Sequence, residues 1–221
     1  MQRAHRSRTR ARIIGAVVLV VLVVAMTLST KFLTPAEVAA IAPKPFDPAG
    51  IATDLYAKAG EELPERAQPL GEVVPALQAD VAAAAETYEA TSPAAKSYVF
   101  PVELTGTVVE ASDASLRVQV EGVPAQTPVI IPLSNAVNGT VIRDVMGFKF
   151  ADAPGQTGYQ YVGDELKKLM LADIEAAVPD PAALEGEQVT VVGALGVQAT
   201  GGAVPRAKPL NVQPVTVEAG R

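Results

Sequence analysis

The 221-residue chain carries 18 lysine and arginine residues against 24 aspartate and glutamate residues, with one histidine and no cysteine. Five arginines lie within residues 1–12, so residues 13–221 hold 13 basic and 24 acidic residues, a net charge of −11. Such an acidic region repels phosphate backbones, which argues against a nucleic-acid partner. The single histidine, His5, lies in the basic tail, so residues 13–221 lack a usual zinc ligand set, a thiol nucleophile and a Ser-His pair.

Residues 13–30 contain no charge and follow the basic tail. As a helix they would reach about 27 Å, close to the roughly 30 Å hydrocarbon core of a bilayer. The sequence predicts a cytoplasmic tail over 1–12 and a transmembrane signal-anchor over 13–30, with the rest of the chain extracytoplasmic at the inner or plasma membrane. A cleavable secretory signal is the alternative, but no small-x-small cleavage site follows the apolar run directly.

Residues 31–97 are predicted to form a helical neck or lid. Thr34 and Glu37 fit a capping box for a helix over about 35–42. Asp47 and Pro48 begin a second helix that is expected to end near Gly60. A third helix is expected over 73–88. The sequence does not decide whether these helices space a domain from the bilayer or pack over it.

From residue 98 onward the sequence becomes rich in valine, isoleucine and threonine. Strands are predicted over 102–110, 116–121, 127–133, 188–197 and 210–217. Three strands, a helical interval and two strands are the order of an oligonucleotide/oligosaccharide-binding (OB) barrel. The predicted fold class is therefore mainly β with helices (α+β), an OB-like small β-barrel over 98–221 preceded by a helical segment and one transmembrane helix.

The helical interval is predicted to hold two helices. Thr140 is expected to cap a short helix over about 141–147. Asp164 is expected to cap a second helix that Pro179 ends, with an apolar face that covers the barrel.

The short helix carries the charged pair that we consider the best candidate for a ligand or partner site. The candidate residues are Arg143 and Asp144, joined by Gln156, Tyr159 and Gln160 from the following loop, whose groups suit sugar hydroxyls. A structural role, in which Arg143 bridges a local carboxylate and orders the loop, is the favoured reading. The strand-like spacing of Tyr159 and Tyr161 indicates a half-buried position.

No cofactor, metal or catalytic residue is predicted. The sequence lacks Gly-x-x-x-x-Gly-Lys-Ser/Thr and Gly-x-Gly-x-x-Gly. Carboxylate pairs such as Glu61-Glu62 and Asp164-Glu165 are more consistent with solvated or helix-capping charge than with acid/base work.

Several short motifs in order resemble the DUF2291 family of predicted periplasmic lipoproteins over about residues 31–218. They are Lys44-Pro45-Phe46-Asp47-Pro48, Phe100-Pro101 to Gly106-Thr107-Val108-Val109, Gly139-Thr140 with Arg143-Asp144, Gly147-Phe148 with Phe150, Tyr159-Gln160, and Gly186 to Gly193. The resemblance implies an uncharacterised bacterial envelope protein with a related barrel, often encoded beside sugar-type ABC importers. This sequence departs from the family in having no lipid-attachment cysteine, and Gly155-Gln156-Thr157-Gly158 stands where the family tends to carry Asn-Gln.

Two functions follow as hypotheses. The favoured one is a non-enzymatic, membrane-anchored extracytoplasmic accessory protein that assists a sugar-type ABC importer. The alternative is a small-ligand or glycan-binding module that uses the barrel face.

Overall fold

The computed structural model describes residues 3–29, 33–35, 37–38 and 45–220, and the chain divides into two units, Met1–Pro45 and Phe46–Arg221. In the first unit, α1 (Arg3–Ser29) is a helix whose side chains from Ile14 onward are exposed. Within the described ranges, no helix combines the length and hydropathy that crossing a membrane requires, so the predicted span over 13–30 finds no support here.

The capping box at Thr34 is confirmed, since Thr34 N–H donates to Glu37 Oε2 at 2.7 Å and Glu37 N–H donates to Thr34 Oγ1 at 3.3 Å. The helix predicted over 35–42 lies mostly outside the described residues.

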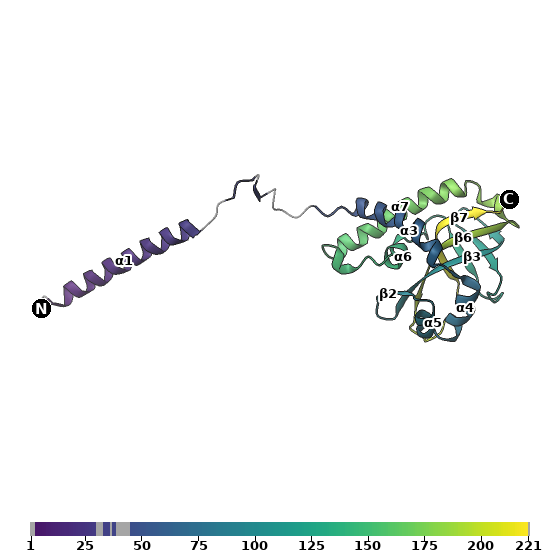
Figure 1. Cartoon of the computed structure of the whole chain (residues 1–221), viewed down its shortest axis with the longest axis horizontal. Helices are drawn as coiled ribbons and strands as arrows, with labels where there is room; N and C mark the ends of the chain where they lie inside the picture. Colours follow the sequence, from purple (N-terminus) through teal and green to yellow (C-terminus); the bar gives the residue numbers. More distant parts are fainter. Residues whose placement is uncertain (1–2, 30–32, 36, 39–44, 221) are drawn as a thin grey trace. The chain divides into compact units, whose positions relative to one another are not determined.

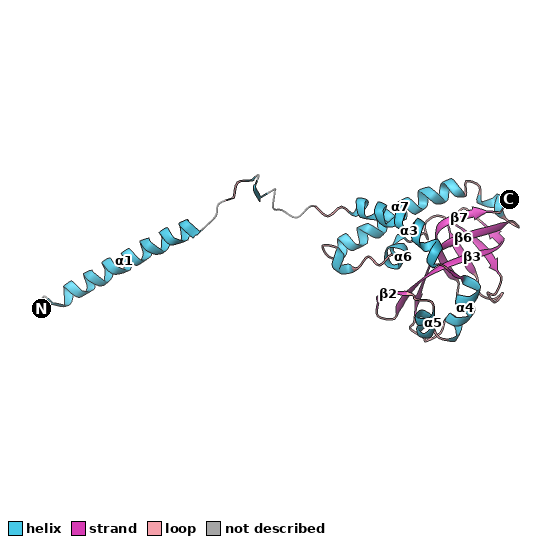
Figure 2. Ribbon diagram, in the orientation of Figure 1, coloured by secondary structure: helices cyan, strands magenta, loops and turns pink. Residues whose placement is uncertain are grey.

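The second unit is built on one sheet with helices packed around it (Figures 1 and 2). Valine, isoleucine and leucine alternate with polar residues along the main strands, so one face of each strand is buried. The five predicted strands are confirmed with shifted ends. The strands are β1 (Gln68–Pro69), β2 (Thr91–Ala94), β3 (Ser97–Ala111), β4 (Ser115–Val120), β5 (Val129–Pro132), β6 (Gln188–Gln198) and β7 (Leu210–Ala219).

Five of these strands pair in a closed circuit. β3 pairs with β4, β4 with β5, β7 with β6 and β6 with β3, all antiparallel, while β5 pairs with β7 in parallel. The circuit leaves no free edge between its members. The long strand β3 closes it, because it pairs with β6 along its first part and with β4 along its last. At Gly106, where both pairings overlap, a Cβ would clash with the Gln119 carbonyl oxygen, so a glycine is required there.

Residues 46–97 pack into the same hydrophobic core as the strands. Ala59, Leu63, Val73 and Leu77 are fully buried in one cluster with Phe100 of β3. The helices are α3 (Pro48–Arg66), α4 (Leu70–Ala79) and α5 (Val81–Thr87). The sequence left open whether these helices form a spacer or a packed lid. The structure shows that α3, α4 and α5 are packed.

The start of α3 is confirmed, because Asp47 Oδ1 accepts from Gly50 N–H at 3.0 Å. Its predicted end near Gly60 is wrong, and the helix continues to Arg66. A glycine inside a helix costs only about 1 kcal/mol. Burial of Ala59 and Leu63 on either side offsets that cost.

The single helix predicted over 73–88 is two helices. Asp80 separates them, because its Oδ1 accepts from Ala82 N–H at 2.8 Å and Ala83 N–H at 3.0 Å and so starts α5. The break turns α5 so that Val81 N–H donates to the Gly202 carbonyl at 2.7 Å, which joins the helix to the loop between β6 and β7.

The helical interval holds α6 (Gly139–Val145), the one-turn helices η1 (Phe150–Asp152) and η2 (Pro181–Leu184), and α7 (Gln156–Ala177). Thr140 does not cap α6. Asn138 does, with its Oδ1 accepting from Thr140 N–H at 3.1 Å.

The predicted start of α7 at Asp164 is also wrong, since the helix begins eight residues earlier at Gln156. Gly155, at φ 96°, turns the chain into the helix, and Tyr159 N–H then donates to its carbonyl at 3.1 Å. Gly158 and Val162 extend the buried face that Leu166 and Met170 continue. In Figure 1, α3 and α7 lie side by side, in agreement with their contacts.

Candidate functional site

The candidate residues lie where α6 crosses α7, and two glycines set the crossing. A Cβ at Gly139 would clash with the Gly163 carbonyl oxygen, and a Cβ at Gly163 would lie 2.7 Å from Thr140 Cγ2. The two backbones therefore approach closely. Arg143 is one turn after Gly139, and Tyr159 is one turn before Gly163, so the crossing brings their side chains together.

Arg143 is 5% exposed, and its guanidinium is held from three sides. Nε and Nη2 donate to Asp144 Oδ1 at 2.9 and 2.7 Å, and Nη1 donates to the Tyr159 carbonyl at 2.8 Å. Its Cζ also lies 3.5 Å from the centroid of the Tyr159 ring, the geometry of a cation–π contact. The guanidinium thus ties the last turn of α6 to the first turn of α7.

Tyr159 completes the cluster. Its hydroxyl donates to Asp144 Oδ1 at 2.9 Å, so one carboxylate oxygen accepts from both side chains. Burial raises the pKa of Tyr159, the hydrogen bond to Asp144 and the negative charge of that carboxylate raise it further, and Arg143 opposes this rise. The phenol therefore remains a protonated donor at neutral pH.

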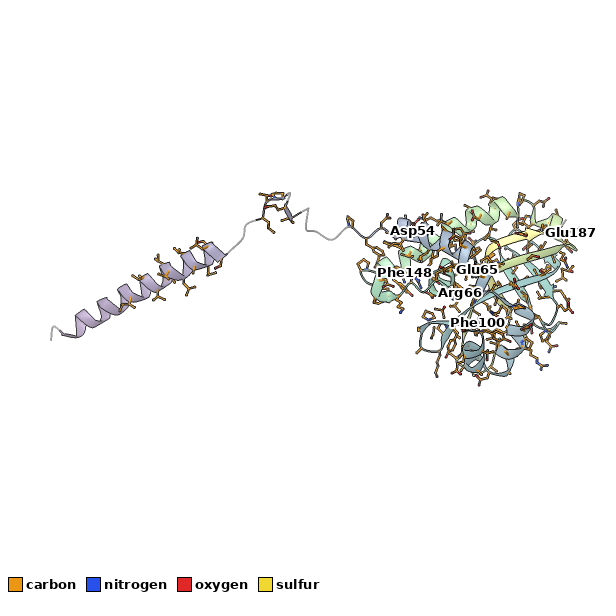
Figure 3. All side chains as sticks on the ribbon, in the orientation of Figure 1. Asp54, Glu65, Arg66, Phe100, Phe148 and Glu187 are labelled. Carbon is orange, nitrogen blue, oxygen red and sulfur yellow. The ribbon has the colours of Figure 1, made fainter. Side chains whose placement is uncertain are left out.

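Two phenylalanines that sequence reasoning left out of the site enclose the Tyr159 ring. Phe148 stacks on it with centroids 6.0 Å apart, and Phe150 meets it edge-on at 5.7 Å. Figure 3 labels Phe148 beside this crossing. The signal in the sequence was a pair of aromatic residues that lie between two glycines, Gly147 and Gly155. In the structure both glycines have a positive φ. We call Arg143, Asp144, Phe148, Phe150 and Tyr159 the arginine–aromatic cluster.

The structure brings three of the five predicted site residues together: Arg143, Asp144 and Tyr159. Gln156 and Gln160 are exposed and lie on α7, not on a loop as predicted. In the described part of the chain, neither amide is hydrogen-bonded to the cluster. Tyr159 and Tyr161 lie in α7 and not in a strand. Residues two apart point to opposite sides of a helix, so Tyr159 packs inward and is half-buried, whereas the half-buried position predicted for Tyr161 is wrong, because that side chain is 53% exposed.

The polar groups of the cluster are used largely within the fold. Arg143 uses donors on all three nitrogens, and Asp144 Oδ1 is saturated. Among the residues that the structure describes, no group of three or more His, Cys, Asp or Glu side chains is arranged to hold a metal ion. What the cluster presents outward is the Phe150 ring, 56% exposed.

Comparison with known proteins agrees with this architecture. The fold is similar to the crystal structure, at 1.90 Å resolution, of an OB-fold protein from Thermotoga maritima MSB8, with a TM-score of 0.66 and 18% sequence identity, covering 80% of this chain and 100% of that one. At that identity the likeness establishes the fold, an OB-fold within a mixed α+β unit. No curated protein matches the chain. Residues 18–218 match the family described as predicted periplasmic lipoprotein (DUF2291), and the chain therefore belongs to that family.

Proposed function

We propose that the protein is a non-enzymatic extracytoplasmic accessory protein that remains at the membrane and presents its OB-fold unit to a protein partner, a component of a sugar-type ABC importer. Its family description places the relatives in the periplasm as lipoproteins. The choice of an importer component as the partner rests on the gene neighbourhood that the family resemblance implies. No catalytic step is part of the proposal.

The membrane attachment in this proposal rests on sequence. This chain has no cysteine to carry a lipid, but residues 13–30 are uncharged and follow five arginines. We propose that this segment is retained as a single-pass anchor with its N-terminus in the cytoplasm. N-terminal sequencing of the mature protein from membranes tests this, because a first residue beyond 30 would rule out retention.

The exposed Phe150 ring is the observation that carries the partner-binding role. It lies on the rigid base formed by Tyr159, Phe148 and the Arg143 guanidinium. Aromatic side chains held rigidly at the surface are the commonest anchors of protein interfaces, because they bury a large area at a small entropic cost. Gln156 and Gln160, exposed on α7, supply hydrogen-bonding groups on the helix that carries Tyr159.

Site-specific photo-crosslinking in cells tests the proposal. A photoreactive residue at Gln160 should capture an importer component after extraction in mild detergent, and one at Gln119, exposed on β4, should not. Phe150→Ser should reduce the capture at Gln160, while Val109→Ser, a change at an exposed valine of β3, should leave it unchanged. Repeated absence of an importer component at Gln160 would contradict the proposal.

A thermal-shift panel of sugars on the same protein tests the glycan-binding alternative. A sugar at 100 times its Kd should add about 2.7 kcal/mol of stability. The outward side chains of β4 and β5 include Arg117, Gln119 and Ile130, none of them aromatic. A flat panel together with crosslinking at Gln160 supports the accessory role, whereas sugar binding without crosslinking favours the alternative.

A further inference from the structure

Two uncharged polar side chains of the second unit are buried as deeply as Arg143. They are Thr127 and Gln213, and each is 4% exposed. A buried hydroxyl or amide costs free energy unless it is hydrogen-bonded, so its partners show what it does in the fold. Thr127 Oγ1 accepts from Gln78 Nε2 at 2.9 Å, which joins the loop before β5 to α4. The partners of Gln213 lie instead at the start of α6.

The Gln213 amide joins β7 to the residues that lead into α6. Its Oε1 accepts from Asn138 N–H at 2.7 Å, and its Nε2 donates to the Ala136 carbonyl at 3.4 Å. Asn138 in turn caps α6, because its Oδ1 accepts from Thr140 N–H at 3.1 Å and from Thr140 Oγ1 at 2.7 Å. One side chain of the barrel therefore holds the residue at which α6 begins.

The Gln213 amide lies just beyond the point where the backbone pairing between β5 and β7 ends. That parallel pairing joins Val129 to Leu210 and Ile130 to Asn211. Farther along, in the part of the chain that the structure describes, no backbone hydrogen bond joins β7 to residues 133–138. The two hydrogen bonds of the Gln213 amide make this link in place of a backbone ladder.

The position of α6 decides where the arginine–aromatic cluster lies. Arg143 is in the last turn of this seven-residue helix, which is too short to be rigid without tertiary contacts. At its end, Thr91 Oγ1 of β2 donates to the Val145 carbonyl at 3.3 Å. Side chains of the sheet therefore hold both ends of α6, and a shift of its start would move Arg143 relative to Tyr159.

We propose that Gln213 is a positioning residue for the partner surface, the exposed Phe150 ring on the arginine–aromatic cluster, and that it acts through Asn138 and α6. Without the Gln213 amide, the start of α6 is released from β7. Arg143 then loses its fixed distance to the Tyr159 carbonyl, and the Phe150 ring loses its rigid base. The inference rests on the proposed function only for what the surface binds, because the link from Gln213 to α6 exists without a partner.

Exchange of the Arg143 Nε–H, followed by NMR on the folded full-length chain, tests the proposal without a partner. Gln213→Met removes both amide hydrogen bonds at similar side-chain length and should accelerate this exchange by at least about tenfold. Thr127→Val removes the hydrogen bond of the other buried polar side chain and should leave the exchange unchanged. Gln213→Asn, whose amide is one methylene shorter, replaces Gln213→Met with the same expectation if that variant does not fold.

Urea unfolding of the same variants separates a local effect from a loss of global stability. Exchange that follows global unfolding accelerates in proportion to the loss of stability, whichever side chain is changed. Acceleration in Gln213→Met beyond that proportion supports the proposal. Acceleration that only matches the loss of global stability, or none at all, would overturn it.

Photo-crosslinking at Gln160 extends the test to the partner. Gln213→Met should reduce the capture of an importer component several-fold, and Thr127→Val should not. Capture by Gln213→Met that equals capture by the native chain would contradict the positioning role. If the native chain itself captures no importer component, the proposed function fails, and the exchange of the Arg143 Nε–H still decides the role of Gln213.

Discussion

Arg143 and Arg66 both lie in the last turn of a helix, where a positive charge is favoured by the helix dipole. Their surroundings differ completely. Arg143 is buried and its donors are used within the fold, whereas Arg66 is exposed and makes no ion pair among the described residues. Position in a helix therefore does not assign a role to an arginine. Burial and hydrogen-bond partners do: Arg143 holds two helices together, and Arg66 is a solvated surface charge.

The largest effect on stability is expected at Arg143, the buried arginine. Arg143→Ala leaves Asp144 near the protein interior without its cation, and we expect a loss of about 3 kcal/mol in the free energy of unfolding. Urea unfolding measures it. The control is Arg117→Ala, whose exposed ion pair with Glu110 at 3.1 Å should contribute less than about 1 kcal/mol. Equal losses for the two variants would show that Arg143 is no more structural than a surface arginine.

The next effect tests how the cluster is positioned. Gly139→Ala places a methyl group against the α7 backbone, so we expect α6 to move away from Tyr159 at a cost of about 2 kcal/mol. Gly60→Ala is the matched control, since a Cβ there meets no atom within 4 Å and should stabilise α3 by about 0.5–1 kcal/mol. If Gly139→Ala is neutral by urea unfolding, the close crossing of α6 and α7 does not hold.

A smaller effect is expected at the Tyr159 hydroxyl. Tyr159→Phe keeps the ring between Arg143 and Phe148 and removes only the hydrogen bond to Asp144. We expect a loss of about 1 kcal/mol at neutral pH, measured by urea unfolding. A loss as large as that of Arg143→Ala would mean that the phenol, and not the guanidinium, holds the cluster together.

The same variant gives a pH test. Burial and Asp144 raise the pKa of Tyr159 above its unfolded value of about 10. The folded state therefore favours the protonated phenol, so this contribution is fully present below about pH 10 and is lost as the pH rises through the folded pKa. The stability difference between the native chain and Tyr159→Phe should shrink from pH 8 to pH 11. A difference that grows over this range would contradict the assigned sign.

The smallest effect on stability is expected at Arg66, the exposed arginine. Arg66→Gln should change the free energy of unfolding by no more than about 0.5 kcal/mol, because the side chain is exposed and has only the helix dipole to lose. Thermal and urea unfolding measure it. A loss close to that of Arg143→Ala would identify Arg66 as a structural residue.

The strand order could be predicted from the sequence because each strand is a run of β-branched residues bounded by turns, and five strands in that order leave few topologies. The start of α7 could not be predicted from the sequence. Gly155, Gly158 and Gly163 have low helix propensity and read as a loop. Only the tertiary structure explains them: a Cβ at Gly163 would meet Thr140 of α6, and one at Gly158 would meet Pro154 and Phe46.

The cluster was predictable only in part. Adjacent residues on a helix do not normally face each other, so the sequence did not require Arg143 and Asp144 to bond. Phe148 and Phe150 reach Tyr159 through the turn at Gly147. Their place between two glycines marks them in the sequence, but it does not indicate which residue they contact. The break between α4 and α5 was missed for a similar reason, because Asp80 within an alanine-rich run reads as helix surface and only its hydrogen bonds to Ala82 and Ala83 show it as a cap.

Hydrogen exchange at the arginine Nε–H groups, followed by NMR on the folded full-length chain, tests the contrast between the two arginines most directly. The Arg143 Nε–H, which donates to Asp144 at 2.9 Å, should exchange slowly, and its signal is assigned by its absence in Arg143→Lys. The Arg66 Nε–H, assigned with Arg66→Gln, should exchange as fast as a solvated arginine. Equal rates for the two groups would contradict the account.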